Sequence, residues 1–253
     1  HQYNRGGSAA RNSGIYYSTG EYISFLDSDD SWDAEKTEKQ ITHLESLSEE
    51  WIASYCDSKF IPEQTNSQLR KYLRRIDDQI RNRHSENLNE NNQSIPDEGG
   101  TELIKHILGL QFGTGGSSTV IVKTDIVKQI HGFDPKFQRH QDWEFLIRVL
   151  EQGKIAHLNE CLVNKYTGGN ADSETIATAK RLYFEKYDDY ISEFDDEVNI
   201  TRDHYFRLGL QHLRDQRRLK GMWHILNNLN GIDKEDGINI ITALGESYAQ
   251  NFY

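Results

Sequence analysis

The feature that most constrains this chain is a short apolar run that ends abruptly in a group of acidic residues. Residues 22–26 have the sequence Tyr-Ile-Ser-Phe-Leu, and Asp27, Asp29 and Asp30 follow at once. The run is rich in aromatic and β-branched side chains and lacks the clean alternation of a strand with one wet face. It therefore predicts a strand buried on both faces, as in a parallel sheet covered by helices.

Helix and strand signals alternate around this run. Ser8 is a candidate N-cap and Gly20 a candidate stop, so the end signals predict a short helix over residues 9–18. A second helix is expected to begin near Asp33, and a third to cover residues 142–150. Further strands are expected at residues 51–56, 119–122, 155–158 and 162–166. This alternation predicts an α/β fold.

Two other parts of the chain differ in composition. Residues 63–100 are dominated by polar side chains and predict an insertion in the form of a long loop. From residue 172 onward apolar side chains recur at helical spacing, which predicts a bundle of about four helices; one of its faces would hold Leu219, Met222, Trp223 and Leu226. We therefore expect an α/β domain over residues 1–170 and a helical region over residues 171–253.

Composition excludes several classes of protein. Hydrophobic residues make up 36 % of the 253 residues and aromatic residues 11 %, which is too many for a disordered chain. No stretch approaches the roughly 20 apolar residues that a membrane-spanning helix needs. The two cysteines lie too far apart for a zinc ribbon. The net charge of −11 opposes general binding to nucleic acid and fits a cytoplasmic protein.

The acidic group after the strand has three interpretations. Neighbouring carboxylates repel one another, and a hard divalent cation bound by their oxygen atoms would offset that repulsion. A solvated acidic turn whose Asp residues cap the next helix is the plainer interpretation. A calcium loop beginning at Asp27 is disfavoured, because Trp32 occupies the position that requires glycine.

Two regions of the chain resemble the family 2 glycosyltransferases of GT-A fold. Residues 4–14 and 20–32 are similar to the family's Asn-x-Gly-x-x-x-Ala-Arg-Asn stretch and to its Gly-Glu-Tyr-Ile strand, which runs into a metal-binding Asp-x-Asp. Residues 132–134 and 141–145 resemble its Gly-Phe-Asp and its Glu-Asp acceptor motif, with Gln141 in place of Glu. The resemblance implies a GT-A-like, Rossmann-like fold: a mixed, mainly parallel sheet with flanking helices, followed here by an all-helical tail.

The same resemblance implies an inverting, metal-dependent transfer of a sugar from a nucleotide diphosphate to a hydroxyl group of a glycan or a lipid-linked saccharide. Asp29 and Asp27 would hold Mn²⁺ or Mg²⁺, which neutralises the charge of the leaving diphosphate. The donor-binding residues that it implies are Gly7, Arg11, Asn12, Asp27, Ser28 and Asp29.

Asp142 is the general base that the resemblance implies. A carboxylate within hydrogen-bond reach can accept the proton of the acceptor hydroxyl even with an ordinary pKa, because the hydroxyl acidifies as the new bond forms. The implied acceptor contacts are Trp143, Gly116 and Gln141. The structural alternatives are that Asp142 caps its helix and that Trp143 packs in the core.

The family's usual first βαβ unit, which holds the nucleotide, has no counterpart in this sequence, so we expect the chain to begin after it. A non-catalytic module that binds a sugar or a nucleotide is therefore the alternative function. The helical tail is expected to pack on the catalytic domain, to form a homodimer, or to dock at the cytoplasmic face of a membrane.

Overall fold

The structure is a computed structural model that describes residues 3–61, 95–166, 171–229 and 234–249. It contains two compact units. The described part of the first unit comprises residues 3–61, 95–107 and 112–166, and that of the second comprises residues 108–111, 171–229 and 234–249. The polar insertion predicted over residues 63–100 lies outside the described residues, except for residues 95–100.

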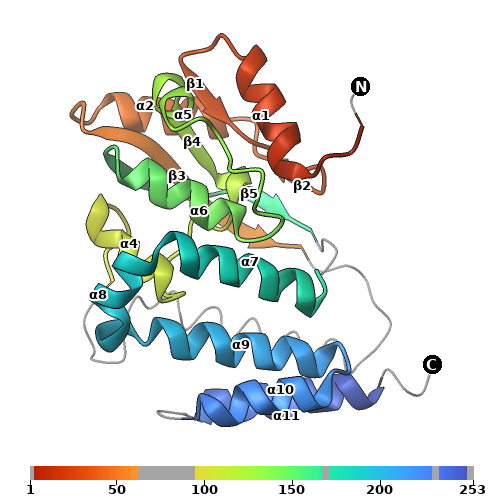
Figure 1. The fold of residues 1–253 in the computed structure, drawn as a ribbon. Helices are drawn as coiled ribbons and strands as arrows, with labels where there is room; N and C mark the ends of the chain where they lie inside the picture. Colours follow the sequence, from red (N-terminus) through yellow and green to blue (C-terminus); the bar gives the residue numbers. More distant parts are fainter. Residues whose placement is uncertain (1–2, 62–94, 167–170, 230–233, 250–253) are drawn as a thin grey trace. The chain divides into compact units, whose positions relative to one another are not determined.

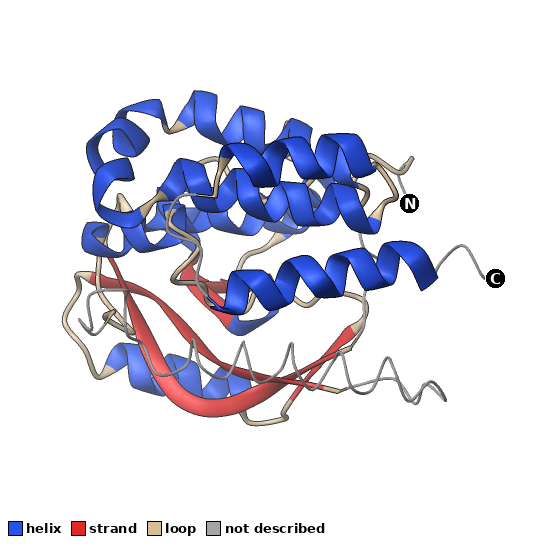
Figure 2. Cartoon of the chain, turned by 90° about the horizontal axis from the view of Figure 1, so that it is seen from below, coloured by secondary structure: helices blue, strands red, loops and turns tan. Residues whose placement is uncertain are grey.

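One mixed sheet forms the centre of the first unit. Its strands are β1 (Tyr22–Ser24), β2 (Asp30–Trp32), β3 (Trp51–Phe60), β4 (Val120–Lys123) and β5 (Lys154–Lys165). They lie in the order β1-β4-β3-β5-β2. Among these strands β3 pairs in parallel with β5, whereas β1 with β4, β4 with β3, and β5 with β2 are antiparallel pairs. Figure 2 shows that the sheet is strongly curled.

The expected α/β class, the mixed sheet and the flanking helices are confirmed, but the sheet is not mainly parallel. The strand predicted over residues 22–26 is wrong in two respects. Strand β1 is only three residues long and stands at the end of the described strand order, with Ile23 buried between two half-buried neighbours. Phe25 belongs to the following turn, where its ring packs edge-on against the rings of Phe133 and Phe145. The apolar run therefore combines a short antiparallel strand with a core aromatic.

Helices α1 (Gly7–Tyr17), α2 (Lys36–Glu45), α4 (Ile104–Leu108), α5 (Thr124–Gln129) and α6 (Gln141–Leu150) accompany the sheet (Figure 1). Helix α2 packs against β3, β4 and β5, and α6 packs against β5. The buried face of α2 carries Lys36, Gln40 and Leu44 at a spacing of four residues. Gln40 donates a hydrogen bond to the carbonyl oxygen of Thr119 at 2.9 Å, which holds α2 to the turn before β4.

Strand β5 is one continuous strand, where the sequence predicts two short ones. It pairs with β3 along its whole length, with register shifts between Cys56 and Ser58. The polar residues 159–160 suggest a turn in the sequence, yet the irregular pairing with β3 absorbs them without ending the strand. The long β3–β5 pair places the end of β5 beside β2.

The second unit is helical, as predicted. Its described residues include α7 (Ser173–Lys186), α8 (Asp188–Val198), α9 (Ile200–Arg214), α10 (Arg218–Asn227) and α11 (Lys234–Ala249), one helix more than expected. Helix α9 packs against α7, α8, α10 and α11 (Figure 1). A core cluster joins Phe206, Leu210, Leu213, Ile225 and Ala243. Within the described residues no helix has the length and apolar character to cross a membrane.

Candidate active site

An ion pair between α1 and the acidic loop forms the centre of the candidate site. Arg11 Nη2 lies 2.5 Å from Asp27 Oδ1 and donates a second hydrogen bond to Ser117 Oγ at 3.0 Å. Ser117 Oγ in turn lies 3.3 Å and 3.4 Å from the two carboxylate oxygens of Asp27. The three side chains come from three separate segments of the chain, so the fold alone brings them together.

The short 3₁₀ turn Ser117–Thr119 ties the acidic loop to the sheet. The Asp27 amide donates to Ser118 Oγ at 3.1 Å, and the Trp32 indole donates to the Ser118 carbonyl oxygen at 2.8 Å. Because these bonds hold the loop on both sides of its acidic residues, the Asp27 carboxylate has a defined position opposite Arg11.

Gly7 and Gln141 complete the surroundings of Arg11. A side chain at Gly7 would begin only 3.2 Å from Arg11 Nη1, so glycine leaves room for the guanidinium group. With its amide oriented so that both ends are satisfied, Gln141 accepts a hydrogen bond from Arg11 Nη1 at 3.0 Å and donates one to the carbonyl oxygen of Phe137 at 3.2 Å. Gln141, predicted as an acceptor contact, therefore links Arg11 to the start of α6.

Asp142 is half-buried at the start of α6, next to this cluster. Its Oδ1 atom is enclosed and has no hydrogen-bond partner among the described residues. Burial raises the pKa of the Asp142 carboxyl group above its ordinary value. The positive charge of Arg11 opposes this rise, and the negative charge of Asp27 adds to it. An enclosed carboxylate oxygen without a partner is a suitable proton acceptor.

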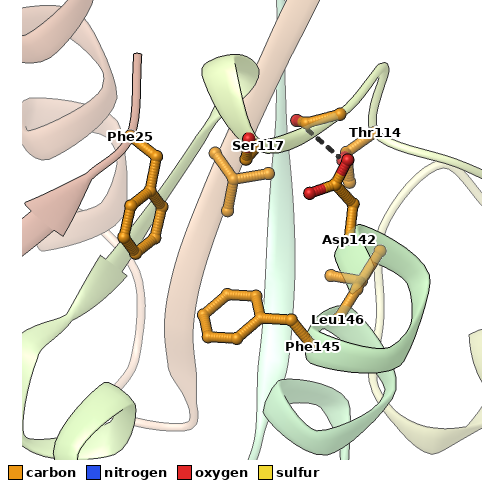
Figure 3. A pocket seen from close by; sticks show the side chains of 8 residues that line it. Phe25, Thr114, Ser117, Asp142, Phe145 and Leu146 are labelled. Carbon is orange, nitrogen blue, oxygen red and sulfur yellow. Dashed lines mark hydrogen bonds between the residues drawn. The ribbon is translucent and has the colours of Figure 1, made fainter. Parts of the chain in front are cut away.

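A narrow recess with about 10 Å³ of free volume, enough for about one water molecule, lies in front of Asp142. In Figure 3, Asp142 and Phe145 on α6 face Phe25 and Ser117 across this recess. Thr114, near its rim, donates a hydrogen bond to the Gly116 carbonyl oxygen at 3.4 Å.

A second cation, Lys165, reaches the site from the end of β5. Its Nζ atom lies 3.0 Å from Asp30 Oδ2. A side chain at Gly116 would begin 3.2 Å from this Nζ and 3.8 Å from Asp142 Oδ2. Gly116 also has a φ of 99°, a conformation that favours glycine. The bare backbone at Gly116 therefore allows the amino group of Lys165 and the carboxylate of Asp142 to lie close to the same point.

Asn12 and Trp143 make other contacts than the predicted ones. Asn12 donates to the carbonyl oxygen of Phe133 at 2.7 Å and accepts from the Phe133 amide at 2.8 Å, so its side chain joins α1 to the segment before α6. Trp143 is half-buried, and its ring stacks on that of His140 with centroids 4.4 Å apart. Neither geometry requires a sugar or a nucleotide.

Comparison with known proteins finds a matching family. The sequence model of glycosyl transferase family 2 matches residues 1–103. Residues 1–103 therefore have the sequence of a family 2 glycosyl transferase.

Two glycosyltransferases of known name are similar to parts of this chain. The amylovoran biosynthesis glycosyltransferase AmsB of Erwinia amylovora is 29 % identical over 161 residues, which cover 62 % of this chain and 46 % of AmsB. The UDP-Glc:α-D-GlcNAc-diphosphoundecaprenol β-1,3-glucosyltransferase WfgD of Escherichia coli is 48 % identical over 43 residues, 17 % of either chain. The chain thus spans less than two thirds of the length of the relatives it matches.

Among solved structures, residues 1–349 of TarS from S. aureus are similar to this chain with a TM-score of 0.44 and 14 % identity. That match covers 100 % of this chain and 74 % of the TarS chain.

The acidic loop of this chain does not form a complete metal cage. Among the described residues no group of three or more His, Cys, Asp or Glu side chains is placed to hold a metal ion. Asp29 and Ser28 are exposed, whereas Arg11 neutralises Asp27 and Lys165 neutralises Asp30. The repulsion that suggested a cation in the sequence is therefore already offset by side chains. Two carboxylates still fit Mg²⁺ or Mn²⁺ that arrives with a diphosphate, because such ions commonly take one or two carboxylates plus substrate phosphates.

The fold thus gathers Gly7, Arg11, Asp27, Gly116, Gln141 and Asp142 in one cluster, of which Gly116 and Asp142 line the recess. Asn12, Ser28 and Asp29 make no described contact with that cluster. Two residues were missed in the sequence analysis, Ser117 and Lys165. Ser117 directly follows Gly116, which the resemblance implies as an acceptor contact. Lys165 reaches the site only through the β2–β5 pairing, which no sequence pattern indicates.

Proposed function

We propose that the first unit carries the acceptor-activating half of an inverting glycosyltransferase that uses a nucleotide-sugar donor and a glycan or lipid-linked acceptor. The observation that carries the proposal is the enclosed, unpartnered Oδ1 of Asp142 beside the Arg11–Asp27–Ser117 cluster. The family match supports the reaction class, and the printed names of AmsB and WfgD support saccharide acceptors. A cytoplasmic location stays a prediction.

Asp142 would take the proton of the acceptor hydroxyl as its oxygen attacks the anomeric carbon. The new C–O bond forms while the bond to the diphosphate breaks, and its electron pair leaves with the diphosphate oxygen. One such displacement inverts the anomeric centre and needs no covalent intermediate on the protein. The raised pKa of Asp142 makes it a stronger proton acceptor once it is ionised.

Arg11 and Lys165 would stabilise the departing diphosphate. Both cations lie close to Asp142, and fixed positive charge in a partly dry site favours the developing negative charge. A divalent ion at Asp27 and Asp29, when bound, would supply further charge neutralisation. Gln141 positions Arg11, and Gly116 leaves the space in which Lys165 and Asp142 approach each other.

The general base is tested by Asp142→Asn. We expect the transfer rate to fall by about 10²–10⁴-fold, because the amide cannot accept the hydroxyl proton. Release of UDP from UDP-glucose and UDP-N-acetylglucosamine, with a diphosphoundecaprenol-linked N-acetylglucosamine acceptor, measures the rate, and isothermal titration measures binding of each donor. Asp125→Asn, at an exposed carboxylate on α5, is the matched control.

Loss of transfer with unchanged donor binding would support the base. Transfer by Asp142→Asn near the parent rate would contradict it. Donor binding by the parent chain without any turnover would instead favour the alternative function, a non-catalytic module that binds a sugar or a nucleotide.

The metal is tested separately by Asp29→Ala. Because this change removes an exposed carboxylate from a set of two, we expect the Mn²⁺ concentration for half-maximal transfer to rise by about tenfold or more. A titration of MnCl₂ after removal of metal with EDTA measures it, with Asp125→Ala as the control. An unchanged Mn²⁺ dependence would exclude Asp29 as a ligand.

A further inference from the structure

Helix α10 carries an apolar stripe that faces outward. Leu219, Met222, Trp223 and Leu226 follow one another at steps of three, one and three residues, which places them on one side of the helix. The exposed fractions of these side chains are 89 %, 36 %, 62 % and 59 %. The sequence predicts this face as part of the bundle core, so its exposure is a result of the tertiary structure.

The opposite side of α10 fixes the helix to its own unit. Ile225 is buried in the cluster with α9, and Gly221 lies so close to α9 that a side chain there would begin 2.9 Å from the carbonyl oxygen of Gly209. Helix α10 is therefore anchored by its buried face, and the four exposed apolar side chains form a fixed surface. We call this surface the α10 stripe.

Helix α10 is basic although the chain as a whole is acidic. The helix contains no acidic residue, and three cations, Arg217, Arg218 and Lys220, lie at its start. Arg217 and Lys220 share a single carboxylate, that of Glu174, so positive charge is in excess at this end of the helix. The chain as a whole has a net charge of −11. The surface around the α10 stripe is both basic and apolar. It is therefore complementary to a partner whose exterior carries negative charge and whose interior is apolar, as in a lipid bilayer.

A lipid surface matches this combination better than a second copy of the chain does. A twofold contact with the two α10 helices parallel would bring the same cations together, which is unfavourable. In an antiparallel contact, neither basic helix start would meet an acidic residue of the partner α10, because the helix contains none. An amphipathic helix with cations beside Leu and Trp instead lies in the plane of an anionic bilayer interface. The ring of Trp223 suits the headgroup region, since it is apolar with one polar N–H.

We propose that the α10 stripe is a docking surface for anionic phospholipid bilayers, with Leu219, Trp223 and Leu226 inserted at the interface and the three cations near the headgroups. The proposal does not depend on transfer activity. Its test measures binding alone, so its outcome and that of the proposed transferase function are separate.

The experiment is co-sedimentation of the full chain with vesicles of equal parts phosphatidylglycerol and phosphatidylcholine, and with vesicles of phosphatidylcholine alone. We expect binding to the anionic vesicles and weaker binding to the neutral ones. The double variant Leu219→Ser/Leu226→Ser should bind the anionic vesicles about tenfold or more weakly, because two exposed apolar side chains are lost from the interface. Both positions are exposed, so thermal unfolding should show an intact fold.

Tyr16→Ser is the matched control, since Tyr16 is 78 % exposed on α1 and carries no part of the α10 stripe. Its binding should equal that of the parent chain. No binding to anionic vesicles, equal binding to neutral ones, or full binding by the double variant would overturn the proposal. So would a dimer in sedimentation-velocity runs that the double variant dissociates, because the stripe would then be occupied by a second copy.

Discussion

Arg11 influences two carboxylates of the candidate site in different ways. It forms a direct ion pair with Asp27, and it lowers the pKa of Asp142 against the larger effect of burial. A single cation therefore both holds the acidic loop and keeps the base ionised at lower pH than burial alone would allow.

This dual role predicts a shift in the pH profile of Arg11→Met. Without the guanidinium group the pKa of Asp142 rises further, so the ionised base is lost at a higher pH as the solution is acidified. The acid limb of kcat/KM should move to higher pH, together with a loss of rate. Arg11→Lys, which keeps the charge, should leave the limb near its parent position. An unmoved limb in Arg11→Met would show that Asp142 does not titrate in the rate.

Gly116 provides a prediction about stability at the same site. An alanine there would adopt a φ of 99° and would crowd Lys165 and Asp142, so we expect a loss of about 1–3 kcal/mol in the free energy of unfolding. Gly113 lies in the same turn, and nothing lies within 4 Å of a side chain added there. Gly113→Ala should change stability by less than about 0.5 kcal/mol. Urea unfolding measures both, and equal effects would contradict the role of Gly116.

At the scale of secondary-structure elements, the site depends on where each element begins or ends. Asp27 follows β1, Asp142 opens α6, and Lys165 closes β5. The pairing of β2 with β5 sets Asp30 opposite Lys165, so one antiparallel pair places a cation beside the acidic loop. The helices and strands thus form the scaffold, and the charged groups of the candidate site lie at or near their ends.

Helices α9 and α10 cross with their backbones close together, and this close contact allows a prediction about stability. An alanine at Gly209 would place its Cβ atom 2.9 Å from Ile225 Cγ1 and 3.0 Å from the carbonyl oxygen of Gly221. Because the helices would have to separate, Gly209→Ala should lower the free energy of unfolding by about 1–3 kcal/mol.

Gly245 in α11 is the matched control for that prediction, because a side chain there would meet nothing within 4 Å. Gly245→Ala should raise stability by about 0.5–1 kcal/mol, as expected for alanine in place of glycine within a helix. The opposite signs can be read from urea unfolding curves. A stabilising Gly209→Ala would show that the two helices do not cross as closely as the structure indicates.

At the scale of the whole molecule, the two proposals belong to different units. Every residue assigned to sugar transfer lies in the first unit, and the α10 stripe lies in the second. Substitutions on the stripe therefore leave the site's own residues unchanged, and substitutions at Asp142 leave the lipid-facing surface unchanged. The basic start of α10 would be attracted to anionic headgroups, so salt should weaken vesicle binding.

The family resemblance, the α/β class and the helical tail were predicted from the sequence, as were several residues that cluster in the candidate site, whose roles stay predictions. Arg11, Asp27 and Asp142 lie in short sequence motifs. Such motifs can be recognised from the sequence without knowledge of the fold, because their residues are close together in the chain. The helices predicted over residues 9–18 and 142–150 are present as α1 and α6. The end signals of the first were wrong, because Ser8 lies inside α1, Gly6 is its N-cap and Ser18 its C-cap.

Only the tertiary structure decided which residues meet. The antiparallel pairing of β1, the arrival of Lys165 beside Asp30 and the exposure of the α10 stripe each depend on contacts between residues far apart in the chain. The sequence pattern of a short apolar strand is the same whether one face of the strand is buried or both are. The pattern of an amphipathic helix is likewise the same whether its apolar side packs in a core or is exposed. Periodicity determines which side of an element is apolar, and packing determines what that side contacts.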